Sequence, residues 1–144
     1  MSKFSQAQQA DEFYAEHRGK PFFSDLTNYM ASDVVTGMEL VKENAIATFR
    51  DVIGPTDPTE AKATARNSIR AHFGADGMRN AVHGSGSASE FQRESSFFFS
   101  KAFAPTAAFN NCTCAIIKPH IVQSGLAGQV IDMILQEGFE ISSM

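Results

Sequence analysis

The apolar residues of this chain change spacing along its length, from a helical period to an extended one and back. Over residues 5–18 they recur at helical spacing, and Ser5 with Gln8 forms a capping-box pattern that predicts where this first helix begins. A second helix is expected from Pro21, because proline suits the first turn of a helix. Its apolar stripe consists of Phe22, Phe23, Leu26, Tyr29 and Met30.

The central third of the chain predicts one strand, one helix and a long polar segment. Residues 34–41 form an apolar run rich in valine, which is typical of a strand. Asn44 is expected to cap a helix that Gly54 ends. Residues 56–77 contain only short apolar pieces among Pro, Thr, Ala, Asn and Gly, so we expect a mostly irregular segment. Long ordered loops of this kind are often functional.

The last third of the chain returns to alternating helices and strands. Ser87 and Ser89 are placed to cap a helix that carries Phe91 and Glu94. Beyond it we expect, in turn, a strand, a helix and a strand over residues 112–117, 124–137 and 139–142.

Composition narrows the class of protein. The 144 residues have the length of one domain, and 43% hydrophobic residues are ordinary for a globular core. A net charge of -4 gives no electrostatic reason to expect a nucleic-acid partner. Because no apolar run approaches the roughly 20 residues that span a bilayer, and the polar start is unlike a signal peptide, we expect a soluble intracellular protein without a membrane partner. Cys112 and Cys114 are expected to share one strand face as reduced thiols, with no zinc set around them.

The segment of residues 79–87 carries the most distinctive chemistry. It places His83 in a turn rich in glycine and serine, directly after a short apolar run. Such a turn keeps the imidazole out of the core, glycines let backbone amides approach a phosphate, and a neutral histidine has a free ring nitrogen near pH 7. Taken alone, the segment is more typical of a surface histidine in a loop.

Residues before and after His83 occur in an order that makes the motif specific. In chain order they are Tyr14, Lys20-Pro21-Phe22-Phe23, Leu26, Arg50, Thr56, Arg70, Asn80, His83 and Glu94. This series resembles the nucleoside diphosphate kinase family, whose signature reads N-x-x-H-G-S-D-S. The resemblance implies an α+β fold, the ferredoxin-like βαββαβ sandwich, and Gly86 stands where the family has an aspartate.

The resemblance also implies a role for each matching residue. His83 would carry the γ-phosphate of a nucleoside triphosphate as phosphohistidine and pass it to a nucleoside diphosphate. Glu94 would hydrogen-bond the other ring nitrogen. The remaining roles are phosphate contacts by Tyr14, Arg50, Thr56 and Arg70, sugar contacts by Asn80, and base contacts by Phe22 and Leu26. Mg²⁺ would come with the nucleotide and be held mainly by it, so no protein metal ligand is expected.

Each of these residues also has an ordinary structural explanation. A glutamate such as Glu94 is commonly solvated on a helix, and arginines such as Arg50 and Arg70 commonly form surface salt bridges. Thr56 and Asn80 are frequent turn residues, and an aromatic such as Phe22 is often part of a core. The structure must therefore show whether they meet at one site.

The family pattern is out of order at the end of the chain. Residues 112–120, with Lys118 and His120, resemble the family's opening strand, although His120 stands where an aspartate is usual. Two arrangements are open. In the arrangement that we favour, the chain is a piece of a two-domain member. Residues 1–99 would be the end of the first domain, residues 100–110 a linker, and residues 111–144 the start of the second domain. The fold would then be incomplete in both domains. The alternative is that 111–144 folds back and completes residues 1–99 as a permutant. Only then would Lys118 contact the phosphate beside His83.

Two functions follow from the resemblance. The first is nucleoside diphosphate kinase activity on nucleoside tri- and diphosphates. The second is a non-catalytic, structural role, since the two-domain members that this chain resembles are ciliary and centrosomal. That likeness implies tubulin or axonemal microtubule proteins as partners. It places the protein in the cytoplasm and cytoskeleton, at the axoneme of a cilium or flagellum, or at a centrosome or basal body.

Overall fold

The structure is a computed structural model that describes residues 2–3, 7–99 and 111–144. Its strands are β1 (Ser2–Lys3), β2 (Val34–Val41), β3 (Val82–Gly84), β4 (Cys112–Ile117) and β5 (Glu140–Ser143). Its helices are α1 (Ala7–Phe13), the 3₁₀ helix η1 (Ala15–His17), α2 (Phe23–Ala31), α3 (Ala45–Ile53), α4 (Pro58–Thr64), α5 (Ile69–Phe73), α6 (Ala88–Phe98), α7 (Pro119–Gln123) and α8 (Ala127–Gln136). None of the described helices is both long enough and apolar enough to span a membrane.

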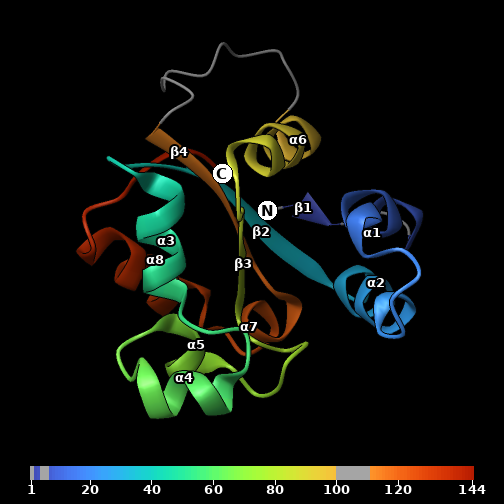
Figure 1. Cartoon of the computed structure of the whole chain (residues 1–144), viewed down its shortest axis with the longest axis horizontal. Helices are drawn as coiled ribbons and strands as arrows, with labels where there is room; N and C mark the ends of the chain where they lie inside the picture. Colours follow the sequence, from blue (N-terminus) through green and yellow to red (C-terminus); the bar gives the residue numbers. More distant parts are fainter. Residues whose placement is uncertain (1, 4–6, 100–110) are drawn as a thin grey trace.

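One antiparallel sheet runs through the molecule, and β4, one of its two inner strands, comes from late in the sequence. β4 lies between β2 and β3, with Met38 opposite Ala115 and His83 opposite Ile116. β1 and β5 both pair with the outer edge of β2, β1 near its start and β5 near its end. Figure 1 shows β4 crossing the centre of the fold beside β2. The sheet thus has four strand positions, and the expected ferredoxin-like α+β arrangement is confirmed.

The pairing of β4 shows where residues 111–144 lie in this fold. The segment of residues 111–144 folds back onto the earlier part of the chain and supplies the inner strand β4, together with α7, α8 and β5. The fold-back, which we gave less weight, is therefore what the structure contains. The assignment of residues 1–99 and 111–144 to two domains of a longer protein stays a prediction, and the linker of residues 100–110 lies outside the described residues.

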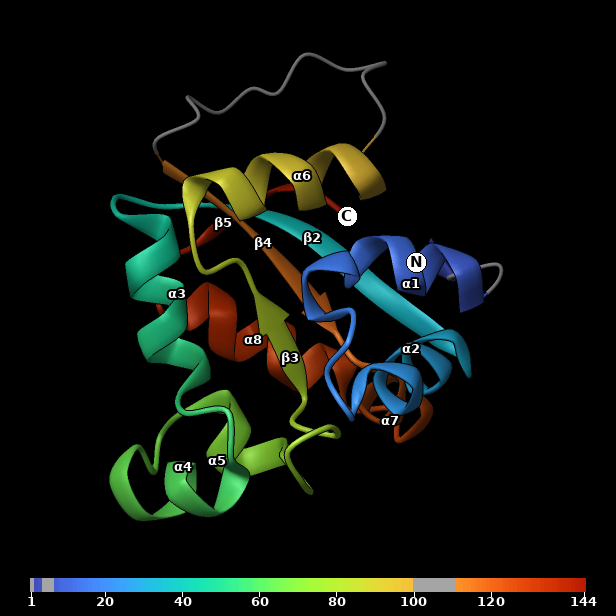
Figure 2. The ribbon, with the colours of Figure 1, turned by 45° about the vertical axis from the view of Figure 1, so that its right-hand side comes forward.

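Both faces of the sheet are covered by helices (Figures 1 and 2). On one face α3 and α8 pack on Met38, Leu40 and Ile117. On the other face α1, α2 and α6 pack on Val35 and Ile116. Because β4 is buried from end to end, it consists of a continuous run of apolar and small residues.

The cysteines follow this division of the sheet. Cys112 and Cys114 are buried on the same face, in the cluster under α1, α2 and α6. Burial raises the pKa of the Cys114 thiol, and the negative charge of Glu94 adds to the effect. Burial also raises the pKa of the Cys112 thiol, and the charge of Glu39 adds to it, so both thiols favour the protonated form.

The expectation of an irregular segment over residues 56–77 is wrong, because it contains α4 and α5. Asp57 accepts a hydrogen bond from the Thr59 amide and precedes Pro58, so α4 has a capped start with proline in its first turn. Ser68 caps α5 in the same way through the amide of Ala71.

Other helix boundaries also differ from expectation. α8 begins at Ala127 rather than at Ser124, since Gly125 adopts a positive φ of 70° that separates it from α7. α7 itself was not expected. Asn44 precedes α3 but makes no side-chain capping bond. The predicted cap of the first helix, Ser5, lies outside the described residues.

Candidate functional site

A cavity of about 880 Å³ opens beside β3 and gathers nine of the ten residues singled out from the sequence. These nine are Tyr14, Phe22, Leu26, Arg50, Thr56, Arg70, Asn80, His83 and Lys118. They come from six parts of the chain: the end of α1, α2, α3, the segment between α3 and β3, β3 itself, and the residue before α7. The tenth, Glu94, lies behind His83 on α6.

His83 is held in a fixed orientation by α6. Its Nε2 donates to Oε1 of Glu94 at 2.9 Å, and the carboxylate is completely buried. The second carboxylate oxygen accepts the hydroxyl of Ser85 at 2.6 Å, and the Ser85 oxygen accepts the backbone amide of Cys114 at 3.2 Å. A carboxylate can only accept, so Nε2 carries the ring proton and Nδ1 keeps its lone pair. Within the described part of the chain, no hydrogen bond reaches Nδ1.

Aromatic edges close off the other side of the imidazole. Phe13 and Tyr14 meet the His83 ring edge-on, with ring centroids 5.5 and 5.9 Å away. Burial raises the pKa of Tyr14 well above its ordinary value, and the Glu94 carboxylate raises it further. The hydroxyl of Tyr14 therefore stays protonated beside the histidine.

Two backbone features bring β3 to its place. A Cβ on Gly84 would lie 2.7 Å from the Phe49 ring, so glycine is needed for β3 to approach α3. Ala81 is fully buried and has φ of 74°, and the amide of Val82 donates to the carbonyl of Asn80 at 3.0 Å. This is a γ-turn, a conformation that costs on the order of 1–3 kcal/mol for a residue other than glycine. The strain lies directly before the strand that carries His83.

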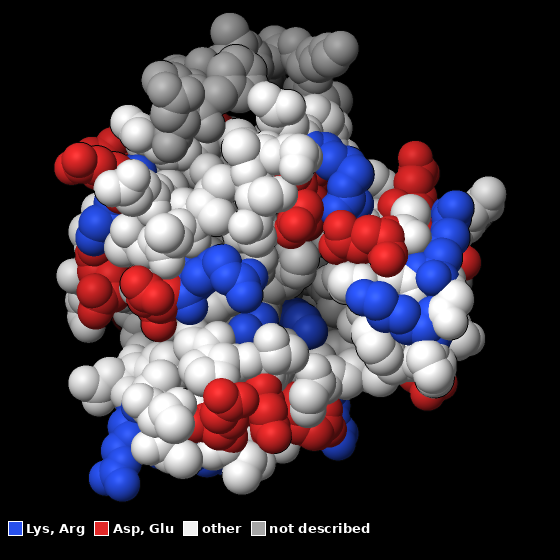
Figure 3. Space-filling view, in the orientation of Figure 1, with Lys and Arg blue, Asp and Glu red and all other residues white. Residues whose placement is uncertain are grey.

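Three cationic side chains line the same cavity. Arg70 is buried and donates to the carbonyls of Gly54 at 2.8 Å and Val82 at 3.2 Å. Lys118 is also buried and donates to the carbonyl of Met78 at 2.8 Å. Arg50 is exposed. Figure 3 shows Lys and Arg atoms in the hollow at the centre of this face. The cations therefore gather where an anion can enter.

The environment lowers the basicity of two of these groups. Burial, reinforced by the charge of Arg50, lowers the pKa of Arg70 to about 10. Burial, reinforced by the charge of Arg70, lowers the pKa of Lys118 to about 7. No carboxylate forms a salt bridge with either group among the described residues. A bound phosphate would supply the missing negative charge and raise both pKa values.

Asn80 and Thr56, both predicted as polar contacts to a nucleotide, are joined to each other by a hydrogen bond. Asn80 is buried, and its amide donates to the carbonyls of Thr56 at 3.0 Å and Gly77 at 3.1 Å. These bonds leave Oδ1 of Asn80 without a partner in the described structure. The Thr56 side chain is exposed at the cavity. Asn80 therefore shapes the loop as well as lining the site.

The predicted base-binding residues form the outer end of the cavity. The Phe22 ring is 46% exposed, and it lies beside His17, with ring centroids 5.8 Å apart. Leu26 is buried next to it on α2. An exposed aromatic face at the mouth of a cavity can stack on a planar ring with little discrimination among bases.

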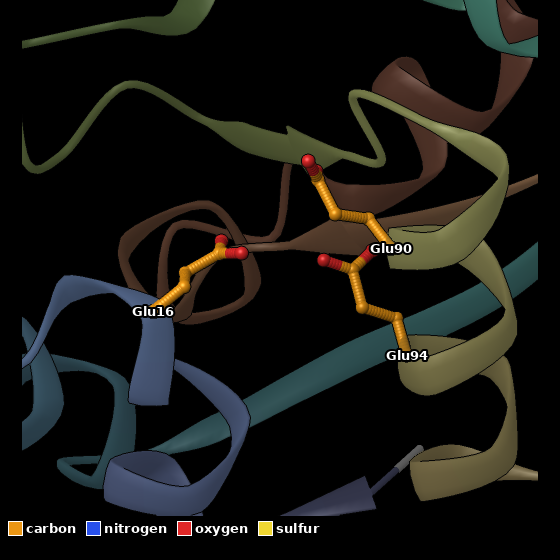
Figure 4. A group of neighbouring side chains, drawn as sticks. All are labelled: Glu16, Glu90 and Glu94. Atoms are coloured by element: carbon orange, nitrogen blue, oxygen red, sulfur yellow. The ribbon is translucent and has the colours of Figure 1, made fainter.

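Three carboxylates meet at another border of the cavity. Ligand atoms of Glu16, Glu90 and Glu94 lie within 4.8 Å of one another, and Figure 4 shows Glu16 and Glu94 pointing toward each other across the gap between η1 and α6. Each already has a partner: Glu16 pairs with Arg93, and Glu90 accepts the Gly86 amide at 2.8 Å. The backbone amide of Gly86, one of the glycines in the turn that carries His83, is therefore bonded to Glu90.

Several contributors to the site were not predicted. Ser85 supports Glu94, and the carbonyls of Gly54, Met78 and Val82 hold the cations. Ser85 stands in the sequence motif itself, where its place after His-Gly could have been used as a signal. Backbone acceptors leave no trace in residue identity, so the carbonyls could not have been found.

The comparisons with known proteins agree with this geometry. Residues 1–103 match the family described as Nucleoside diphosphate kinase. The chain is 38% identical over 140 residues to "Nucleoside diphosphate kinase homolog 7" of Rattus norvegicus, covering 94% of this chain and 35% of that protein. It is 50% identical over 91 residues to the nucleoside diphosphate kinase of Salinibacter ruber, covering 63% of this chain and 62% of the relative. The chain therefore belongs to the nucleoside diphosphate kinase family.

A solved structure supports the fold independently. An orthorhombic crystal form of the Aquifex aeolicus nucleoside diphosphate kinase matches with a TM-score of 0.62 and 40% sequence identity. The match covers 69% of this chain and 70% of that one. The chain spans about a third of the length of the homolog 7 relatives from rat and mouse.

Proposed function

We propose that this chain transfers the γ-phosphate of a nucleoside triphosphate to a nucleoside diphosphate through a phosphohistidine at His83. The proposal rests on the hydrogen bond from Nε2 of His83 to Glu94, which leaves Nδ1 as the basic ring nitrogen. The His83 ring lines the same cavity as Arg50, Arg70 and Lys118. Family membership supports the kinase-like class, and the geometry supports the finer role.

The first step forms a bond from Nδ1 of His83 to the γ-phosphorus as the bond from that phosphorus to the β–γ bridging oxygen breaks. The leaving diphosphate takes the electron pair, and the ring gains positive charge. Glu94 stabilises that charge because its buried carboxylate accepts the Nε2 proton. In the second step a terminal oxygen of the acceptor diphosphate attacks the phosphorus, and the bond to Nδ1 breaks.

The arginines and the lysine bind and neutralise the phosphates during both steps. Arg70 offers a planar guanidinium fixed by two carbonyls, and Lys118 offers an ammonium that phosphate keeps protonated. A triphosphate carries more negative charge than these groups balance, so a divalent cation fits. Mg²⁺ usually keeps water ligands and binds substrate phosphates, which agrees with a cavity whose nearest carboxylates already have partners. When bound, the ion would neutralise part of the phosphate charge.

The test is the intact mass of the full chain after brief exposure to Mg-ATP. We expect one acid-labile phosphoryl group on the native chain and none on His83→Ala. His72→Ala is the matched control, since His72 is an exposed histidine on α5 that does not line the cavity. A chain that is folded by circular dichroism and gains no phosphoryl group would overturn the proposal.

The ciliary and centrosomal placement also stays a proposal. It rests on the resemblance of this chain to the two-domain members and on its similarity to the homolog 7 proteins of rat and mouse. Co-sedimentation with axonemal doublet microtubules tests it. Stoichiometric binding that His83→Ala leaves intact would support the structural role, whereas absence of binding would leave the enzymatic role alone.

A further inference from the structure

A second histidine, His120 on α7, joins three of the elements that surround the cavity. Its Nδ1 lies 2.5 Å from the hydroxyl of Tyr29 on α2. Its Nε2 lies 3.4 Å from the carbonyl of Phe73, the last residue of α5. The imidazole is partly buried between them. One ring therefore contacts α2 and α5 while belonging to α7.

The partners of His120 fix where its proton lies. The Phe73 carbonyl can only accept, so Nε2 must carry a proton to bond with it. The backbone amide of His120 donates to the Tyr29 hydroxyl at 3.4 Å, which directs the hydroxyl proton toward Nδ1. A neutral ring protonated on Nε2 satisfies every one of these groups.

The surrounding charges favour the same neutral form. Burial lowers the pKa of His120, and the charges of Lys118 and Arg79 lower it further. The Phe73 carbonyl and the carboxylate of Asp76 act in the opposite direction but do not reverse the shift. The Tyr29 hydroxyl is uncharged near pH 7, because burial raises its pKa to about 12.

The location of His120 connects it to the cavity. Lys118 is the residue that precedes α7, and its carbonyl accepts the Ile121 amide at 3.1 Å in the first turn of that helix. α2 carries Leu26 and α5 carries Arg70, and both line the cavity with Lys118. The ring thus sits where the segment bearing Lys118 meets the elements bearing Leu26 and Arg70.

We propose that His120 is a positioning residue that, as a neutral ring bonded to Tyr29 and Phe73, fixes the start of α7 and thereby holds Lys118 in the phosphate-binding cavity. The consequence for activity rests on the proposed function, whereas the consequence for Lys118 does not.

Gln123 on the same helix provides a matched comparison. It donates to Asp33 at 2.7 Å, on the same side of the fold-back, but at an exposed position.

The test compares four full-length variants with the native chain: His120→Leu, His120→Gln, Tyr29→Phe and Gln123→Ala. Leucine removes both ring bonds. Glutamine restores one acceptor and one donor on a flat group. Tyr29→Phe removes the hydroxyl that bonds Nδ1 and the backbone amide of His120, and it keeps the imidazole and its bond to Phe73. It therefore tests the proposal if the leucine variant does not fold.

The first readouts are independent of catalysis. In ¹⁵N spectra we expect His120 to be neutral and protonated on Nε2 at pH 7. In ¹³C-lysine spectra we expect Lys118 to titrate near pH 7 in the native chain, and nearer the ordinary lysine value in His120→Leu and Tyr29→Phe, because Lys118 gains water as α7 loosens. An Nδ1-protonated ring, or a Lys118 titration identical in every variant, would overturn the proposal.

The second readouts are the affinity for Mg-ADP and the rate of phosphohistidine formation. We expect His120→Leu to weaken both about tenfold and Tyr29→Phe to do so less, as for the loss of buried hydrogen-bond partners. Glutamine should restore both to within about threefold, and Gln123→Ala should change them less than twofold. If no variant, including the native chain, forms phosphohistidine, the proposed function fails, while the lysine and histidine spectra still decide the role of His120.

Discussion

The cavity has an inner wall and a rim that differ in how their side chains are held. The inner wall consists of Arg70, Asn80, His83 and Lys118, together with Glu94 directly behind His83. Each is hydrogen-bonded to a backbone carbonyl or to a neighbouring side chain. The rim consists of Phe22, Arg50 and Thr56, which are exposed. No salt bridge within the described residues involves Arg50.

The difference separates two ways of contributing to binding. The inner wall is ordered by folding, so its conformational entropy is already lost before a nucleotide arrives. The exposed side chains of the rim keep more rotamer freedom, which a bound nucleotide would remove. Substitutions in the inner wall should therefore change both stability and activity, whereas substitutions at the rim should change binding alone.

The largest effect is expected for Glu94→Ala in the inner wall. It leaves the Ser85 hydroxyl and Nε2 of His83 without their acceptor, and it empties a fully buried volume. We expect the free energy of unfolding to fall by about 3 kcal/mol and phosphohistidine formation to slow on the order of 100-fold. Urea unfolding and rapid-quench phosphorylation measure the two.

Glu90→Ala is the control for that substitution, since Glu90 lies one turn earlier on α6 and is only partly buried. It should lower stability by less than about 1 kcal/mol. Equal losses of stability for Glu90→Ala and Glu94→Ala would contradict the distinction between the buried carboxylate that bonds His83 and the partly buried carboxylate at the border of the cavity.

The next effect is the pH dependence that Lys118 imposes. Its pKa is lowered to about 7 in the folded chain, while the unfolded chain keeps the ordinary value of about 10.4. Above pH 7 the unfolded state therefore binds more protons, so this group makes stability rise with pH, by up to about 1.4 kcal/mol per unit between pH 7 and 10. Below pH 7 the full cost of burying its charge remains.

Lys118→Met isolates this contribution. The native chain should gain stability relative to the variant as pH rises from 7 to 9, because the variant lacks the group. At pH 7 the variant should bind Mg-ADP about 20-fold more weakly, since a charge-assisted bond to phosphate is lost. Urea unfolding at several pH values and calorimetric binding provide the measurements, and a stability difference that stays constant with pH would count against the buried-lysine interpretation.

A smaller effect is expected for Arg50→Ala at the rim. We expect the Kd for Mg-ADP to rise about fivefold, with the free energy of unfolding changed by less than about 0.5 kcal/mol. Arg70→Ala is the comparison in the inner wall and should lower both affinity and stability, because it leaves the carbonyls of Gly54 and Val82 unpaired. Similar stability losses in the two variants would remove the difference between rim and inner wall.

A similarly small effect is expected for Phe22→Ala. Loss of about 1 kcal/mol of stacking corresponds to a roughly fivefold weaker affinity. Because every base has a π-face, the factor should be alike for purine and pyrimidine diphosphates. Competition binding with four nucleoside diphosphates checks this, and a change confined to one base would indicate that Phe22 selects among bases.

The sequence predicted best those elements whose pattern of apolar and polar residues is determined by burial alone. The predicted bounds of β2 (Val34–Val41) and β4 (Cys112–Ile117) match the structure, because both strands are buried on both faces and appear as apolar runs. α4 and α5 were missed because they are short and polar, and their starts depend on the single caps Asp57 and Ser68.

Which residues meet at the candidate site could be predicted only in part. The order of motif residues indicated that His83, Arg50 and Arg70 belong together, and the structure places them at one cavity. The position of Lys118 could not be settled, since it depends on whether residues 111–144 pair with β2 and β3, which local pattern does not encode. The roles assigned to these residues stay predictions.

The position of β4 has a consequence for synthesis on the ribosome. β2 and β3 are made first, yet in this fold each finds its main partner only when residues 112–117 emerge. Until α8 follows β4, the apolar face of β2 that later packs under α8 has α3 but not α8 to pack against. Long-range pairing of this kind folds slowly and exposes strand edges. Nascent chains of this protein are therefore expected to need a chaperone during the interval between β2 and β4.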